Sequence, residues 1–339
     1  MIAKGDGVEG TAKPTFEGLA ERLPQLTFQP QADSDWGADA QVQAYLDHYR
    51  INLAQEYPGV RHGFGRVAAM GFELATHYWL PENPRGTLVV VHGYYDHVGL
   101  YGHALRFGLD QGYAVLAFDL PGHGLSSGAH ASIDSFDQYA DALHQILAAG
   151  ESMLPSPWHC LGQSTGGATV LNYLWRHSSE RFDRIALCAP LVLPFGWRTS
   201  FWAYWLARPF LKKVRRVFRS SSHDRAFNHF VRYEDGLQYP YLPVKWVTAM
   251  RRWDSQFFSF PVLDKPLLVV QGDADRTVDW RYNLTRIRHR LPNTQVHMIN
   301  GASHHLVNES PPYRMPVFDA IAQWLNDSEL NRDESATLS

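Results

Sequence analysis

The order of apolar runs along the chain constrains its fold more than any other feature of the sequence. From residue 87 onward, short β-branched runs such as TLVVVHG (87–93) and YAVLAFDLPGHG (113–124) alternate with segments of helical spacing such as 99–112 and 132–150. Strands separated by helices of about 10–15 residues indicate βαβ units and a mostly parallel sheet. The sequence therefore predicts an α/β fold, with a mostly parallel central sheet flanked by helices.

The alternation continues towards the C-terminus and is preceded by a hairpin. The further expected elements are WHCLGQ (158–163) with a helix after it, RIALCAP (184–190), PLLVVQGD (266–273), a helix near 279–290, TQVHMING (294–301) and a last helix over about 305–325. Ahead of the alternation, RHGFGRVAAM and FELATHYWL lie on either side of Gly71. Two extended runs around a glycine are typical of an antiparallel hairpin.

Changes in composition divide the chain into segments. The predicted segments are an N-terminal arm and helix (1–59), a core in two parts (60–190 and 261–326), a cap insertion (191–260) and a polar tail (327–339). The first 35 residues are rich in Gly, Pro and polar residues, so we expect them to be loosely attached. The insertion is rich in Trp, Phe, Tyr and Arg and is predicted to be a helical cap over one end of the sheet. The tail is expected to be frayed.

The bulk composition argues against several classes of protein. With 45 % hydrophobic residues in 339 the chain can bury a large core, and 19 % charged residues with a net charge of −3 are unlike a nucleic-acid-binding protein. Cys160 and Cys188 each lie in an apolar run and are predicted to be reduced core residues. The N-terminus shows no apolar signal region, and no run approaches the ~20 apolar residues of a membrane span. We therefore expect a soluble, cytoplasmic protein.

Two segments match G-x-S-x-G, a pattern in which hydrolases hold a nucleophilic serine: GLSSG (124–128) and GQSTG (162–166). Such a nucleophile elbow needs a strand that enters, a strained turn that holds the serine, and a helix that leaves. WHCL and ATVLNYLWRH supply both elements around GQSTG, whereas the strand before GLSSG has already ended and no helix start follows it. Ser164 is therefore the candidate nucleophile, and Ser126 and Ser127 are predicted loop residues that could border the site.

Neither a phosphate loop nor a metal site is predicted. Gly162 to Gly167 has the spacing G-x-x-x-x-G, but Ala-Thr follows where a phosphate loop needs Lys-Ser/Thr. His92, His97 and His103 with Asp96 match no zinc spacing. We expect no cofactor and no metal.

A serine nucleophile needs a base, and the base needs a carboxylate that orients it. After the insertion, Asp275 follows a predicted strand at a distance from which it can reach back; Asp279 fits a helix cap and Asp273 a turn. After the last strand, GASHH offers His304 and His305 as the base. His297 lies within a strand, where we expect a buried structural role.

Four segments in this order resemble the monoacylglycerol lipase and lysophospholipase branch of the α/β-hydrolase family, over most of residues 60–325. They are VVVHGYYDH, AFDLPGHGLSSG, GDADRTVD and GASHHLVNE. They are similar to that branch's His-Gly-x-x-Glu-His oxyanion segment, its Asp-x-x-Gly-His-Gly-x-Ser loop, the Gly-x-x-Asp of its triad acid and the Gly-x-x-His-Glu-Leu of its base. The resemblance implies an α/β-hydrolase fold.

Taken residue by residue, the resemblance assigns the acid to Asp275 and the base to His304. Two positions depart from the family pattern. Asp96 replaces the usual Glu before His97, and His305 stands where the family usually has Glu. The second departure leaves the choice between the two histidines open.

The mechanism that this resemblance implies is acyl transfer without a metal. His304 would take the proton of Ser164, and Asp275 would hold the imidazole in the required tautomer. The backbone N–H groups of Tyr94 and Thr165 would hold the oxyanion, each contributing about 3 kcal/mol to transition-state stabilisation. The implied substrates are esters of the monoacylglycerol or lysophospholipid kind.

The insertion carries a dense aromatic half followed by a basic half. The basic residues are Arg208, Lys212, Lys213, Arg215, Arg216 and Arg219, with no acid between them. The aromatic residues could line an acyl tunnel or enter a lipid headgroup region while the cations meet anionic headgroups, which would place the protein peripherally at a membrane. Alternatively, the aromatic residues pack the cap onto the core and the cations form a solvated face. Both interpretations stay open, as does the oligomeric state.

Other functions remain compatible with the same residues. A thioesterase, an acyltransferase, a peptidase or a small-ester carboxylesterase would use the same Ser, Asp and His in the same order. A non-catalytic scaffold is disfavoured because all three are present. Labelling by a fluorophosphonate probe would separate these enzymes from an inert scaffold.

Overall fold

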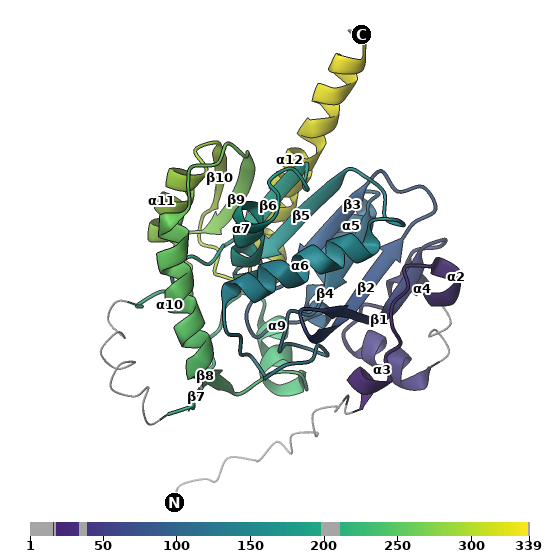
Figure 1. Ribbon diagram of the computed structural model, residues 1–339, viewed down its shortest axis with the longest axis horizontal. Helices are drawn as coiled ribbons and strands as arrows, with labels where there is room; N and C mark the ends of the chain where they lie inside the picture. The colour runs from purple at the N-terminus through teal and green to yellow at the C-terminus, as the bar shows by residue number, and fades with distance from the viewer. Residues whose placement is uncertain (1–15, 17, 34–38, 198–210, 338–339) are drawn as a thin grey trace, which may run out of the picture.

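The computed structural model describes residue 16 and residues 18–33, 39–197 and 211–337. A sheet of eight strands runs through the molecule in the order β1-β2-β4-β3-β5-β6-β9-β10 (Figure 1). The strands are β1 (Arg61–Ala69), β2 (Phe72–Leu80), β3 (Thr87–Val91), β4 (Ala114–Phe118), β5 (Trp158–Gln163), β6 (Arg184–Cys188), β9 (Leu267–Gly272) and β10 (Thr294–Ile299). The predicted α/β fold class is confirmed.

The direction of the strands brings several strand ends together. β1 and β2 form the predicted antiparallel hairpin and β2 is antiparallel to β4, while the remaining neighbours in the sheet are parallel. Val91 at the end of β3 lies opposite Gly162 of β5, and Gln163 lies opposite Cys188 of β6. Because ligands bind at the carboxyl edge of parallel sheets, functional residues are expected where these strands end.

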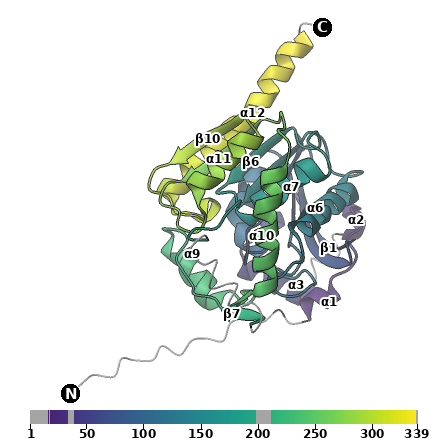
Figure 2. The same ribbon diagram turned by 60° about the vertical axis from the view of Figure 1, so that its left-hand side comes forward.

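Helices cover both faces of the sheet (Figures 1 and 2). One face carries α6 (Phe136–Gly150), α7 (Thr165–Arg176), α10 (Val244–Ser259) and α11 (Trp280–Arg290), and the other carries α5 (Gly102–Asp110) and α12 (Pro311–Thr337). In α6, Ser135 caps the first turn by accepting a hydrogen bond from the Asp137 N–H, and Phe136, Ala140 and Leu143 are buried at helical spacing. Each face therefore has its own hydrophobic cluster. Cys160 and Cys188 lie inside these clusters as free thiols, as predicted.

The N-terminal segment is not loosely attached over residues 18–33, so that prediction is wrong there. Leu19 and Leu23 are fully buried, and the chain pairs with β1 through bonds from the Leu26 N–H to the Arg66 carbonyl and from the Arg66 N–H to the Pro24 carbonyl. Apolar residues scattered through this Gly- and Pro-rich segment cover the edge strand, which composition alone did not indicate. The short helices here are α1 (Leu19–Arg22), α2 (Pro30–Asp33), α3 (Ala40–His48) and α4 (Leu53–Glu56).

The insertion contains short elements and one long helix. These are β7 (Lys213–Arg215), α9 (Arg225–His229), the π-helical turn η3 (Phe230–Glu234), β8 (Tyr241–Pro243) and α10. Residues of α10, among them Met250 and Trp253, are buried in the cluster that α6 and α7 share, and the Trp253 indole donates to the Leu191 carbonyl at 3.1 Å. The second half of the insertion is thus part of the packing of the core. Most of the aromatic run lies at 198–210, outside the described residues.

The C-terminal region differs from the prediction in two ways. α12 begins at Pro311, after the short 3₁₀ turn η4 (Leu306–Asn308), and continues to Thr337, projecting from the body in Figure 1, whereas we expected a helix end near 325 and a frayed tail. The segment after 325 contains no Gly or Pro that would stop a helix. His297 is exposed on β10 rather than buried, because β10 is the last strand of the sheet. In the described part of the chain, no helix combines the length and apolar composition needed to cross a bilayer.

Candidate active site

Ser164 lies in the tight turn between β5 and α7. Its backbone has φ 54° and ψ −111°, a conformation that a non-glycine residue rarely adopts, and the residue is only 7 % exposed. A Cβ atom at Gly166 would lie 2.0 Å from the Val91 carbonyl oxygen, so only glycine fits two residues after the serine. The turn therefore has the strand, strain and glycine that a nucleophile elbow requires.

The second G-x-S-x-G segment has a different place in the fold. The Ser126 hydroxyl donates to the Asp119 carbonyl at 2.6 Å and accepts from the Ala75 N–H at 2.9 Å, and the Ser127 hydroxyl accepts from the Glu73 N–H at 2.8 Å. Both side chains thus fasten a loop to β2. They are loop residues, as predicted, and their hydroxyl groups serve as structural hydrogen-bonding groups.

A histidine and an aspartate extend in series from Ser164. His304 Nε2 lies 2.9 Å from Ser164 Oγ, and His304 Nδ1 lies 2.8 Å from Asp275 Oδ2. With the Nδ1 proton donated to the carboxylate, Nε2 is the unprotonated nitrogen that faces the hydroxyl. These three residues come from the ends of β5, β9 and β10, which the sheet brings to one edge.

The Asp275 carboxylate is buried, and both its oxygens accept hydrogen bonds. Its Oδ1 accepts from the backbone N–H groups of Thr277 at 2.7 Å and Val278 at 3.2 Å, and Oδ2 also accepts from the Gln271 amide at 3.1 Å. Burial acts to raise the pKa of Asp275, but the His304 imidazole and these N–H groups outweigh it and hold the pKa below its ordinary value. The carboxylate is therefore ionised at neutral pH.

The rival residues have other partners. Asp273 accepts from the Gly301 N–H at 2.6 Å, in a turn, and Asp279 accepts from the Tyr282 N–H at 3.3 Å, as the cap of α11. His305 Nε2 lies 3.1 Å from Asp96 Oδ2, so this nitrogen is directed at Asp96 and not at Ser164. The geometry thus separates the two adjacent histidines, which the sequence left open.

The segment after β3, residues 92–97, passes beside Ser164, and we call it the oxyanion loop. A Cβ atom built at Gly93 would lie 3.4 Å from Ser164 Cβ. The Tyr94 ring stacks on Trp246 with 3.8 Å between centroids, and within the described chain the Tyr94 N–H donates to no acceptor. Thr165 is the first residue of α7, so its N–H has no preceding helical turn to bind. Both predicted oxyanion donors flank the serine.

His92 supports this loop as a neutral side chain. Its Nδ1 lies 2.7 Å from the Gly93 carbonyl, and its Nε2 accepts from the Leu120 N–H at 2.8 Å. Burial lowers the pKa of His92 to about 3, which agrees with a ring that carries one proton. Among the described residues, no three His, Cys, Asp or Glu side chains are grouped so that they could hold a metal ion.

Sequence reasoning missed Asp235, which lies in the insertion. Asp235 is fully buried; both its oxygens lie 3.2 Å from His97 Nε2, and Oδ1 accepts from the Tyr49 hydroxyl at 2.8 Å. The three residues come from the insertion, the oxyanion loop and the end of α3. Asp235 matches no motif and lies 138 positions from His97, so only the folded chain reveals the pair.

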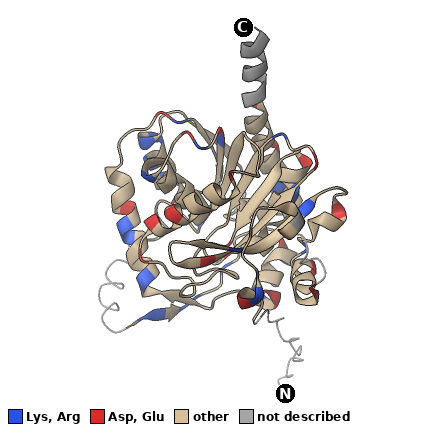
Figure 3. Cartoon of the chain, turned by 45° about the vertical axis from the view of Figure 1, so that its right-hand side comes forward, with Lys and Arg blue, Asp and Glu red and all other residues tan. Residues whose placement is uncertain are grey.

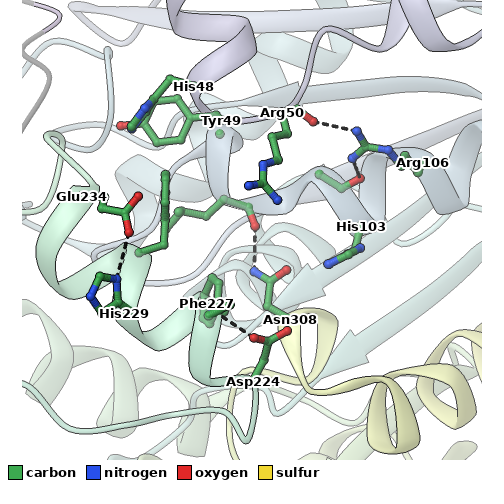
Figure 4. Close-up of a pocket in the computed structure, with 15 residues that line it drawn as sticks. His48, Tyr49, Arg50, His103, Arg106, Asp224, Phe227, His229, Glu234 and Asn308 are labelled. Atoms are coloured by element: carbon green, nitrogen blue, oxygen red, sulfur yellow. Dashed lines mark hydrogen bonds and ion pairs between the residues drawn. The ribbon is translucent and has the colours of Figure 1, made fainter.

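A cavity of about 550 Å³ lies apart from Ser164 (Figure 4). Its walls come from α3, α5, α9 and η3, and the residues labelled in Figure 4 are His48, Tyr49, Arg50, His103, Arg106, Asp224, Phe227, His229, Glu234 and Asn308. The two acids already have partners, because Glu234 binds His229 at 2.9 Å and Asp224 accepts from the Phe227 N–H. None of Ser164, His304 and Asp275 lines this cavity.

A serine in a strand–turn–helix elbow, with a histidine and an aspartate bonded in series at the carboxyl edge of this sheet, defines the class of serine hydrolases with the α/β-hydrolase fold. The chain belongs to the serine aminopeptidase S33 family, whose model matches residues 82–311. The resemblance that the four sequence motifs carried is thereby confirmed at the level of the family. The chain is therefore a serine hydrolase.

Relatives and solved structures agree with this assignment. The monoacylglycerol lipase of Mycolicibacterium smegmatis is 27 % identical, over 78 % of this chain and 96 % of its own length. Human monoglyceride lipase is 26 % identical, over 77 % and 89 % of the two chains. A monoglyceride lipase structure from Saccharomyces cerevisiae superposes with a TM-score of 0.66 at 19 % identity, covering 78 % of this chain and 94 % of that one. The last likeness shows the shared fold.

Proposed function

We propose that this protein hydrolyses carboxylic esters of lipid-like alcohols through an acyl-serine intermediate on Ser164. The observation that carries the proposal is the hydrogen-bonded series Ser164–His304–Asp275, with 2.9 Å and 2.8 Å between the successive partners. A general base must lie within about 2.6–3.2 Å of the proton that it takes, and His304 meets this condition.

In the proposed acylation step, Ser164 Oγ attacks the ester carbonyl carbon while its proton passes to His304 Nε2. The carbonyl oxygen becomes an oxyanion, which accepts hydrogen bonds from the backbone N–H groups of Tyr94 and Thr165. When the carbon–oxygen bond to the alcohol breaks, His304 returns the proton to the leaving alkoxide. The alcohol departs and Ser164 keeps the acyl group.

Deacylation repeats these roles with water as the nucleophile. His304 takes a proton from water, the hydroxide attacks the acyl-serine, and the proton returns to Ser164 Oγ as the carboxylic acid leaves. Asp275 remains ionised in both steps: it fixes the Nδ1–H tautomer and stabilises the imidazolium that forms twice in each cycle. Its lowered pKa supports this role.

Monoacylglycerols or lysophospholipids are the proposed substrates. Two kinds of relative support this class: the monoacylglycerol and monoglyceride lipases, which align along most of their length, and a phospholipase of Bacillus subtilis, 28 % identical over 34 % of this chain and 44 % of its own. The half-buried Tyr94 ring, which lies in the loop beside the elbow and stacks on the buried Trp246, offers apolar surface for an acyl chain.

A peripheral contact with an anionic lipid surface is part of the proposal, and the basic cluster supports it in part. Lys212, Lys213, Arg215 and Arg219 are exposed, and β7 lies at the edge of the molecule, blue in Figure 3 at its basic positions. Arg216 differs, because its guanidinium stacks over Tyr95 at 3.9 Å and donates to Gln238. Reversal of Lys212 and Arg215 to Glu should weaken binding to vesicles that contain phosphatidylserine. Unchanged binding would favour a merely solvated face.

The test of the function is a substrate series on the wild type and on Ser164→Ala. Esters from acetyl to palmitoyl are compared on glycerol and lysophosphatidyl headgroups, together with an aminoacyl arylamide, because the family is described as serine aminopeptidase. We expect kcat/KM to rise with acyl length on the esters and Ser164→Ala to be inactive. Preference for the arylamide would replace the esterase proposal with a peptidase, and a maximum at acetyl would make the protein a small-ester carboxylesterase.

A further inference from the structure

We propose that Asp235 and Gln238 of the insertion are positioning residues that hold the oxyanion loop, residues 92–97, in its working conformation. This inference rests on the proposed function, because it gives the loop its importance through the Tyr94 N–H. Neither residue touches the reacting atoms. Both act through the backbone that presents the donor.

The loop contains a strained residue directly after the proposed donor. Tyr95 has φ 68°, a conformation that L side chains rarely adopt and that persists only where the surroundings enforce it. Within residues 92–97 the described backbone makes one hydrogen bond, from the Asp96 N–H to the Gly93 carbonyl at 3.2 Å, and it does not involve the carbonyl of Tyr95. External contacts must therefore fix the path of the chain at Tyr94 and Tyr95.

The insertion supplies those contacts at Tyr95. The Gln238 amide donates to the Tyr95 carbonyl at 2.9 Å, and the Tyr95 hydroxyl donates to the Tyr241 carbonyl at 3.1 Å. The Arg216 guanidinium lies over the Tyr95 ring at 3.9 Å and donates to the Gln238 side-chain oxygen at 2.8 Å. Gln238 therefore bonds the strained peptide and is itself fixed by a stacked cation.

Asp235 contacts both His97, at the C-terminal end of the loop, and the Gln238 side chain. Its carboxylate accepts from the Gln238 amide at 2.9 Å and from the Leu237 N–H at 2.9 Å, and both oxygens lie 3.2 Å from His97 Nε2. Burial lowers the pKa of His97, but Asp235 more than offsets this effect and raises it above its ordinary value. The buried pair thus joins the insertion to the loop by a charge-assisted bond.

The start of the loop is fixed by the core instead. His92 bonds the Gly93 carbonyl, and the Tyr101 hydroxyl accepts from the Gly93 N–H at 2.8 Å. Gly93 is therefore anchored without the insertion, whereas Tyr95 and His97 are anchored by it. The Asp96 side chain is also held by the core, because its carboxylate accepts from the Tyr101 hydroxyl at 2.9 Å and lies 3.1 Å from His305 Nε2. If the insertion contacts are removed, the backbone at Tyr94 and Tyr95 loses its support, while Gly93 and the Asp96 carboxylate stay held. The expected defect is a misplaced oxyanion donor, with the Ser164–His304 contact intact.

The experiment compares an ester with its thionoester, in which sulfur replaces the carbonyl oxygen and accepts hydrogen bonds poorly. A defect in the oxyanion donors lowers kcat/KM for the ester more than for the thionoester, whereas a smaller folded fraction lowers both equally. We expect Gln238→Ala and Asp235→Asn each to lower the ester-to-thionoester ratio about tenfold, less than the 10²–10³ that follows loss of an entire donor. Ser164→Ala should abolish both reactions.

Gln256→Ala is the matched control, because Gln256 is also a half-buried glutamine of the insertion whose amide donates to a carboxylate, that of Asp137 at 2.8 Å. Its ratio should equal that of the wild type. An unchanged ratio in Gln238→Ala, or an equal fall on both substrates, overturns the positioning role and leaves the proposed function standing. If Asp235→Asn does not fold, Gln238→Ala decides alone. Hydrolysis that persists in Ser164→Ala overturns the proposed function and the positioning role together.

Discussion

Two buried aspartate–histidine pairs lie in different regions of the molecule. Asp275 and His304, 2.8 Å apart, lie at the edge of the sheet; Asp235 and His97, 3.2 Å apart, join the insertion to the oxyanion loop. In each pair one ring nitrogen binds the aspartate, and the other, which we call the far nitrogen, points away from it. The far nitrogen of His304, Nε2, faces the Ser164 hydroxyl, whereas that of His97, Nδ1, is buried and has no hydrogen-bond partner among the described residues. In the roles proposed above, the same two side chains make a proton acceptor in one place and a structural link between two segments in the other. What the far nitrogen faces decides between these roles.

The largest difference is expected between the two histidines. His304→Ala removes the proposed base and should lower kcat by about 10⁴- to 10⁶-fold, as in other serine hydrolases that lose the triad histidine. His97→Gln should lower kcat/KM only about ten- to a hundredfold, because the loop shifts and the base remains. Steady-state kinetics on one ester measure both. Equal losses would show that the pairs do not differ in role.

The next largest effect distinguishes the roles of the two carboxylates near His304, those of Asp275 and Asp273. Asp275→Asn should lower kcat about 10⁴-fold while the protein stays folded, because the amide no longer favours the Nδ1–H tautomer. Asp273→Asn is the control, and kcat should stay within the same order of magnitude since Asp273 only accepts from a turn N–H. A large loss in Asp273→Asn with little change in Asp275→Asn would mean that Asp273, and not Asp275, is the acid.

A third aspartate–histidine pair sharpens the comparison. His305 binds Asp96 at 3.1 Å, one position along the chain from the proposed base. His305→Gln should lower kcat/KM about fivefold, the equivalent of one hydrogen bond worth about 1 kcal/mol. A loss as large as that of His304→Ala would mean that both histidines take part in proton transfer.

The smallest effect concerns pH and stability. The pKa of His97 is raised in the folded protein, so its contribution to stability is complete below the unfolded pKa of about 6.5 and is lost as the pH rises through the folded value. The pKa of Asp235 is lowered, so its contribution is present above about pH 3.9 and is lost in acid. The difference in melting temperature between wild type and Asp235→Asn should therefore be greatest between about pH 4 and 6.5 and shrink above. A difference that grows with pH would contradict a charged pair.

Much of the site is predictable because its determinants are local. The strand before Ser164, the helix after it and the flanking glycines are contiguous, and the elbow needs nothing else. The acid and the base follow from their places after later strands, which a parallel sheet brings to one edge. His304 and His305 are adjacent in a loop, and the path of that loop decides which side chain faces Ser164. A loop has no periodic pattern from which its path could be predicted.

The rest of the fold depends on contacts between distant segments. Leu19 and Leu23 lie in a Gly- and Pro-rich segment, so their burial against β1 was missed. His297 was assigned to the interior because its strand was recognised, but the sequence did not show that this strand is the last of the sheet. Asp235 matches no motif, and its partners Tyr49 and His97 come from two parts of the chain that are distant from it in the sequence.

The bond between His97 and Asp235 limits how such enzymes can be recombined. An insertion without a carboxylate and an amide at the places of Asp235 and Gln238 should leave the loop unsupported, and a chimaera that carried it would be expected to fold around a displaced backbone donor. Chimaeras that keep Asp235, Gln238 and Tyr49 should retain turnover, whereas chimaeras without these residues should lose it. The insertion and the oxyanion loop should therefore be exchanged together in any chimaera.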